Sequence, residues 1–201
     1  MNFLAHLYLV RDDEQLMLGG LFGDFVRGLR ALRAYPPGVR EGIRLHRFID
    51  RETDADPAVK QLVQTFPKPY RRYAGIIADI AFDHVLARQW PAWCDEPLDD
   101  FDRRVRRILA TNDGPAPEKA LRFMRYADLR GLFAAYADEP EFLRTLTGVG
   151  RRLKRANPLG QVGAIWPDMK GACEQVFAEV MPRIQYAVDD WRNRKSTITG
   201  S

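Results

Sequence analysis

Proline and glycine residues divide this chain into segments of helical length, and this division limits the fold more than any other feature of the sequence. Strong breaks fall at residues 36–38, 56–57 and 67–69. Proline fits neither a helix interior nor a central strand, so each break ends one element and starts another. The segments between the breaks lack the alternating hydrophobic pattern of strands. We therefore predict an all-α protein.

The predicted helices form a single-domain bundle. At 201 residues, of which 46% are hydrophobic, the chain has enough apolar surface for one core. We predict one domain over residues 1–195 and a flexible polar tail over residues 196–201. The predicted helices are a short one after Asn2 and the segments 13–30, 39–53, 58–66, 70–90, 98–110, 117–137, 141–156 and 169–194.

The cysteine content and the net charge indicate the cellular compartment of the protein and the kind of partner it binds. Cys94 and Cys173 are the only cysteines and form no Cys-x-x-Cys pair, which favours a reducing, cytoplasmic setting. The apolar N-terminus lacks the basic leader of a signal peptide, and no segment reaches the roughly 20 apolar residues of a membrane span. The formal net charge of +4 favours acidic partners.

All three histidines lie in the first 84 residues, in apolar segments that also contain carboxylates or arginine. In the predicted helix 39–53, His46, Arg47 and Asp50 lie three or four residues apart and can share a face. Such a face can hold a metal ion and a phosphate. The alternative for this segment is a helix salt bridge beside a core histidine.

The apolar predicted helix 70–90 carries Asp79 and Asp83, four residues apart, followed by His84. Burying an ionised carboxylate costs several kcal/mol unless a cation or hydrogen-bond donors compensate, so these aspartates require a counter-charge. A divalent metal would supply it. Arg72, two helical turns before Asp79, would supply it in a purely structural ion pair.

Asp24 lies in a third apolar segment, after glycines at positions 19, 20 and 23. Glycine is less favourable than alanine in a helix by about 1 kcal/mol. We therefore expect these glycines to permit close approach by another helix or by a ligand. The segment lacks the Gly-Lys-Ser/Thr ending of a phosphate-binding P-loop.

Together these residues offer nitrogen and oxygen ligands without sulfur. This donor set suits Mn²⁺, Mg²⁺ or Fe²⁺ better than a structural zinc ion. It predicts metal-assisted hydrolysis of a phosphate ester, in which a metal activates water and arginine neutralises developing charge. Arg27, Arg47 and Arg72 are the nearest arginines.

At these residues the chain resembles the acyl carrier protein phosphodiesterases, an unusual branch of the HD phosphohydrolase superfamily. The resemblance rests on residues 2–7, 23–28, 42–50, 53–54, 79–88 and 90, and continues more loosely through 132–136 and 146–159. It implies an HD-like helical fold. The chain has no His-Asp dipeptide and instead has Asp83-His84, so the ligand positions of ordinary HD enzymes do not transfer directly.

The resemblance also implies a reaction and a set of site residues. The reaction is hydrolysis of the phosphodiester that joins 4′-phosphopantetheine to the serine of an acyl carrier protein, with Mn²⁺ as the expected metal. Arg47 is the expected phosphate clamp, and His6 is a ligand, a proton donor to the serine oxygen or an ordinary core histidine. The implied metal ligands are Asp24, His46, Asp50, Asp83 and His84, and the implied catalytic residues are His6, Asp24, Arg47 and Asp79.

Two other functions are open at this point. The same metal site would suit a phosphohydrolase of nucleotides or another small phosphodiester. A non-catalytic module that binds nucleic acid through arginines would leave the buried carboxylates unexplained, and we expect neither nucleic acid nor a membrane as partner. For an acidic carrier protein, the basic clusters 151–155 and 103–107 are candidate docking sites, with a solvated helix face as the alternative for each.

Overall fold

The structure is a computed structural model that describes residues 1–122 and 133–199. The regular elements in this part of the chain are helices, without a strand, which confirms the all-α prediction. The α-helices are α1 (Phe3–Tyr8), α2 (Glu14–Phe22), α3 (Gly28–Leu32), α4 (Pro37–Ala55), α5 (Pro57–Thr65), α6 (Lys68–Arg71), α7 (Ala74–Arg88), α8 (Leu98–Ala110), α10 (Glu139–Arg152) and α11 (Trp166–Thr199). Short 3-10 helices span Trp90–Ala92, Ala134–Ala137 and Leu159–Ala164.

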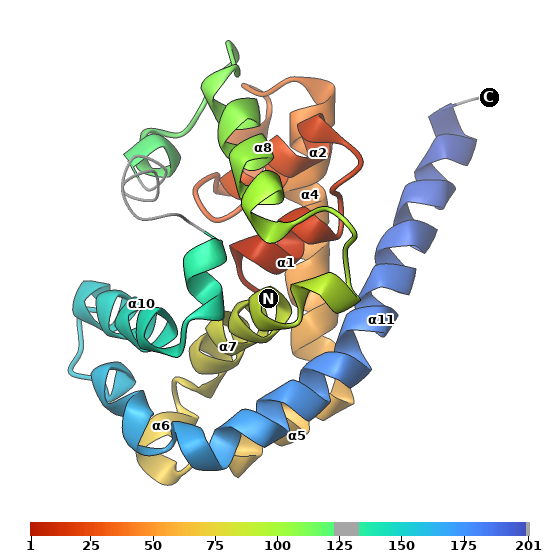
Figure 1. Ribbon diagram of the computed structural model, residues 1–201. Helices are drawn as coiled ribbons and strands as arrows, with labels where there is room; N and C mark the ends of the chain where they lie inside the picture. The colour runs from red at the N-terminus through yellow and green to blue at the C-terminus, as the bar shows by residue number, and fades with distance from the viewer. Residues whose placement is uncertain (123–132, 200–201) are drawn as a thin grey trace.

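The bundle is built around α4 and α7. Figure 1 shows α2 and α8 in the upper part of the view, α5 and α6 at the bottom, and α11 running from the bottom to the upper right. Helix α1 packs against α2 and α7, while α11 packs against α4, α5 and α7. No helix in the described part of the chain is both long and apolar enough to cross a membrane.

Helix α7 is central because its sequence is apolar nearly all round. Eleven of its residues are buried, among them Ile77, Phe82 and Leu86. Helices α1, α5, α10 and α11 all pack against it. A helix that is hydrophobic on every side is stable in water only when other helices cover it, and these four helices cover α7.

Proline and aspartate set the ends of the helices as the sequence predicts. Pro37 stands in the first turn of α4, where its missing N–H would have no intrahelical partner. Asp56 ends α4 and also caps α5, where its carboxylate accepts a hydrogen bond from the Ala58 N–H at 2.8 Å. Asp13 caps α2 in the same way, through the N–H groups of Gln15 and Leu16.

Two predicted helices are each divided into two in the structure. The predicted helix 13–30 ends at Phe22 and resumes as α3, because the chain turns at residues 23–27 and Gly28 has a φ of +78°. The predicted helix 70–90 is divided into α6 and α7. Residues 123–132 of the predicted helix 117–137 lie outside the described residues, and α11 extends through Thr199 into the predicted tail. The HD-like arrangement and the domain limits stay predictions.

Helices α2 and α4 make the most extensive contact between elements, and glycines make it possible. A Cβ on Gly42 would lie 2.4 Å from the Leu16 carbonyl oxygen, and one on Gly19 would lie 2.4 Å from the Val39 carbonyl oxygen. Both obstacles are backbone atoms, which cannot rotate away. The backbones of α2 and α4 therefore lie closer to each other than they could if residue 19 or residue 42 carried a side chain.

We expect Gly42→Ala to lower the free energy of unfolding by about 1–3 kcal/mol, the cost of forcing extra atoms into a packed interior. Gly171→Ala in α11 is the matched control, because a Cβ there meets nothing within 4 Å. It should stabilise the helix by up to about 1 kcal/mol. Urea unfolding followed by circular dichroism measures both, and equal stability of the two variants would contradict the close approach.

Candidate functional site

His6, His46 and Asp50 form a compact group of potential metal ligands. One side-chain atom from each lies within 4.8 Å of those from the other two. His6 Nε2 lies 3.0 Å from Asp50 Oδ1, and His46 Nε2 lies 3.3 Å from Asp50 Oδ2. The imidazole rings are stacked, with centroids 3.9 Å apart. The two oxygens of one carboxylate therefore face one nitrogen of each histidine.

His46 and Asp50 reach this group from one face of α4, and Asp24 approaches from the turn after α2. Asp24 Oδ1 lies 3.4 Å from His46 Nε2. Gly23 makes this possible, since a Cβ there would lie 2.2 Å from His46 Cγ. The imidazole of His46 is buried, whereas the side chain of Asp24 is 53% exposed. The histidines thus lie at the base of the site and Asp24 at its mouth.

Asp79 joins the site from α7 through the amino terminus. The Met1 ammonium donates a hydrogen bond to Asp79 Oδ1 at 2.9 Å and lies 4.0 Å from Asp50 Oδ1. Burial acts to lower the pKa of this amino group, but Asp79 and Asp50 outweigh it and the pKa is raised. Within the described residues no Arg72–Asp79 ion pair forms, so the counter-charge of Asp79 is the ammonium group.

The protonation states of this group suit cation binding. Burial and the neighbouring His46 lower the pKa of His6 to about 4, so its imidazole is neutral at pH 7. Burial acts to raise the pKa of Asp50, but hydrogen bonding to His6 and the charges of both histidines outweigh it. The pKa of Asp24 is likewise lowered, despite burial, by His46. His6 therefore offers a neutral imidazole, and Asp24 and Asp50 offer ionised carboxylates.

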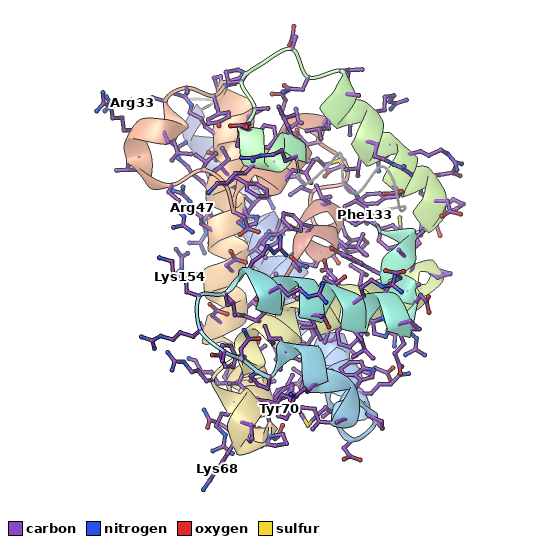
Figure 2. All side chains as sticks on the ribbon, turned by 90° about the vertical axis from the view of Figure 1, so that its left-hand side faces the viewer. Arg33, Arg47, Lys68, Tyr70, Phe133 and Lys154 are labelled. Carbon is purple, nitrogen blue, oxygen red and sulfur yellow. The ribbon has the colours of Figure 1, made fainter. Side chains whose placement is uncertain are left out.

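Arg47 lies at the edge of the site and holds the turn that carries Asp24. It donates a hydrogen bond to the Val26 carbonyl oxygen at 2.6 Å. Figure 2 shows its side chain projecting from the middle of α4. Since guanidinium has five N–H donors, this bond leaves others available to a ligand. Arg27, three residues after Asp24, is exposed, and so is Arg72, which lies between α6 and α7.

The residues present fit a divalent cation. Nitrogen and oxygen ligands bind such ions at about 2.1 Å, so two ligands of one ion lie up to about 4.2 Å apart. The spacing within the His6, His46 and Asp50 group needs only a small contraction to meet this limit. Asp24 and Asp79 stand beside the group as further oxygen donors.

Comparison with known proteins identifies the family of this chain. The profile of the acyl carrier protein phosphodiesterase family matches residues 1–184. This chain belongs to that family. Relatives named acyl carrier protein phosphodiesterase, from Shigella boydii and Enterobacter sp., are 33% and 34% identical over 188 residues, which are 92% of this chain and 95% of each relative. A relative of the same name from Salmonella agona is 34% identical over the same lengths. No solved structure matches.

Asp83 is not part of the His6, His46 and Asp50 group and instead supports α1. Its two oxygens accept hydrogen bonds from the backbone N–H groups of Leu4 and Ala5, at 2.8 and 3.0 Å. The first turn of a helix has N–H groups without intrahelical partners, and Asn2 supplies no side-chain cap. Burial, partly offset by these bonds, raises the pKa of Asp83 to about 7. Asp83 therefore sets the position of the helix that carries His6.

His84 faces a different part of the interior. Its ring stacks on Phe142 of α10, with centroids 4.8 Å apart, and its Nδ1 lies 2.6 Å from the Tyr136 carbonyl oxygen. The structure does not bring it together with His6 and His46. The ligand roles expected for Asp83 and His84 stay predictions, and the geometry favours structural roles for both.

Sequence reasoning missed two contributors to the site. The Met1 ammonium is one, because nothing in the sequence pattern places a chain end beside a distant aspartate. Asp54 is the other: burial, and then the charge of Asp79, raise its pKa. The sequence does contain a signal for Asp54, because it follows Asp50 by four residues and residues with this spacing share a helix face.

We expect Asp83→Ala to lower the free energy of unfolding by about 2–5 kcal/mol, because it leaves two buried N–H groups without acceptors. Asp95→Ala, at an exposed position, is the control and should change stability by less than about 0.5 kcal/mol. Both values come from urea unfolding without added metal. A stable Asp83→Ala protein would show that α1 does not depend on this carboxylate.

Proposed function

We propose that this protein hydrolyses the phosphodiester between 4′-phosphopantetheine and the serine of an acyl carrier protein, releasing apo-carrier and 4′-phosphopantetheine. Family membership over residues 1–184 supports the substrate. The group formed by His6, His46 and Asp50 supports the chemistry, and it is the single observation that carries the reaction type. Hydrolysis in the cytoplasm fits the two separate cysteines, which are free thiols.

We assign His6, His46 and Asp50 as ligands of a divalent metal, with Mn²⁺ as the expected ion and Asp24 as a further ligand. When bound, such an ion polarises phosphate oxygens and lowers the pKa of a water molecule. His6 and His46 provide nitrogen ligands from the buried base of the site. Asp50 places one carboxylate oxygen beside the Nε2 atom of each imidazole, and a bound ion would replace these contacts.

The remaining residues position the substrate and balance charge. Arg47 binds the phosphate, because it borders the site and its planar fork matches phosphate oxygens. Asp79 and the Met1 ammonium balance each other beside Asp50, which keeps the carboxylate cluster from repelling itself apart. The role of proton donor to the leaving serine oxygen does not suit His6, because its imidazole is neutral at pH 7.

The ligand assignment predicts which variants lose metal. Asp50→Asn and His46→Ala should each weaken Mn²⁺ binding by at least about 10- to 100-fold. Removing a residue that only hydrogen-bonds to a metal ligand already costs this much affinity, and removing the ligand itself should cost no less. His84→Ala, another buried histidine, should bind Mn²⁺ as the wild type does. Calorimetric titration measures affinity directly, and circular dichroism checks that each variant folds. If His84→Ala lost as much Mn²⁺ affinity as Asp50→Asn, the metal site would have to include His84 of α7.

The activity is tested with purified holo-carrier and Mn²⁺. Mass spectrometry should show the carrier losing its phosphopantetheine group, and chelation of the metal should stop the reaction. Asp24→Ala should fold normally and lower turnover strongly, because it removes an exposed carboxylate and not a packing group. A carrier that keeps its prosthetic group, together with rapid hydrolysis of nucleotides or another small phosphodiester, would replace the proposed substrate.

A further inference from the structure

Basic side chains on this protein fall into two classes according to whether a carboxylate neutralises them. The cluster 103–107 in α8 belongs to the neutralised class. Its four arginines form ion pairs, namely Arg103 with Asp100, Arg104 with Glu96, Arg106 with Asp102 and Arg107 with Glu14. A surface whose cations already have anionic partners attracts an acidic protein weakly, so this candidate docking site is not favoured.

The segment around α3 belongs to the other class. Arg30 and Arg33 are exposed, and within residues 1–122 and 133–199 neither forms an ion pair or a side-chain hydrogen bond. Leu29 directly precedes Arg30 and is 78% exposed, the most exposed large hydrophobic side chain among the described residues. An exposed apolar side chain beside uncompensated cations is unfavourable in water and typical of a surface that a partner covers.

A second segment of this class follows α10. Lys154 and Arg155 are exposed, and no carboxylate in the described parts of the chain pairs with either of them. The chain leaves α10 here and passes close to α7, where the Tyr73 hydroxyl donates a hydrogen bond to the Ala156 carbonyl oxygen at 3.3 Å. This segment is thereby fixed near the helix that carries Asp79.

These two segments flank the mouth of the site. The α3 segment starts directly after the turn that bears Asp24, and Arg47 holds that turn through Val26. Figure 2 shows Arg33, Arg47 and Lys154 projecting from the same edge of the molecule, with Arg47 between the other two. The mouth itself carries exposed carboxylates, including those of Asp24 and Asp50. An acidic partner can approach such a mouth only if cations on either side offset the repulsion.

We propose that Arg30 and Arg33 on one side, and Lys154 and Arg155 on the other, form the face on which the carrier protein docks, with Leu29 in an apolar contact. This inference rests on the proposed function and specifies how the substrate is held. Charge complementarity requires that the docking face of the carrier be acidic. The phosphate at the serine then enters between the two basic segments and reaches Arg47.

Charge reversal tests each segment separately. Arg30→Glu with Arg33→Glu, and Lys154→Glu with Arg155→Glu, should each lower kcat/KM for holo-carrier by about 10-fold or more, since steering by clustered charge changes association rates by 10-fold to 1,000-fold. The dependence of kcat/KM on salt should also become flatter. Hydrolysis of bis(p-nitrophenyl) phosphate with Mn²⁺ should stay at the wild-type value, because this small substrate reaches the site without docking.

The control is Lys60→Glu, a reversal at an exposed lysine of α5 without an ion pair among the described residues. Helix α5 lies at the bottom of Figure 1, whereas Arg33 lies at the top of Figure 2, and the two views share the vertical axis. Lys60→Glu should keep both activities and the wild-type salt dependence. A change in carrier kinetics equal to that of the double variants would overturn the docking face.

The outcomes separate this proposal from the proposed function. If the wild type releases phosphopantetheine and either double variant matches Lys60→Glu, the docking face is wrong and the function stands. If the wild type releases none, the function fails and the docking proposal fails with it. Binding of duplex DNA that is lost in both double variants, with carrier kinetics unchanged, would assign the face to nucleic acid and overturn the proposal.

Discussion

The approach of α2 to α4 is the contact on which the site depends. Gly19 and Gly42 let the two backbones meet where any side chain would collide with backbone atoms. The turn after α2 is thereby brought onto α4, and Gly23 lies against the ring of His46. Asp24 reaches His46 only because this turn is so close. The cost of glycine in a helix, about 1 kcal/mol relative to alanine, is offset by the placement of the site.

Parts of this arrangement follow from the sequence and parts do not. The breaks at proline predict the ends of α4 and α5, and the spacing of His46 and Asp50 predicts that they share a face, because both are local properties of the chain. The glycines predict a close approach, but not which helix is approached. His6 stacks on His46 across two helices 40 residues apart in the sequence, and such contacts depend on packing that no local pattern encodes.

Asp83 shows why burial of a charge does not by itself identify a ligand. Its place in an apolar helix correctly indicates that something must compensate the carboxylate. The sequence offers a metal or an arginine for this role, whereas the structure uses two backbone N–H groups of α1. Backbone donors are invisible to pattern analysis, since every residue except proline has one. The Met1 ammonium beside Asp79 is a second donor of this kind.

The potential ligand atoms of the site are carboxylate oxygens near the solvent and imidazole nitrogens in the interior. This arrangement determines the order in which an entering ion would meet them. Asp24, Asp50 and Asp79 are about half exposed, whereas the two imidazoles are almost fully buried. A hydrated cation arriving from solvent meets carboxylates first and can exchange its water molecules for their oxygens one at a time. Contact with the imidazoles requires it to be nearly stripped of water. Ions that dehydrate reluctantly, as Mg²⁺ does, would therefore be held up at the rim, and the site would sort cations by their rates of water exchange as well as by their affinities.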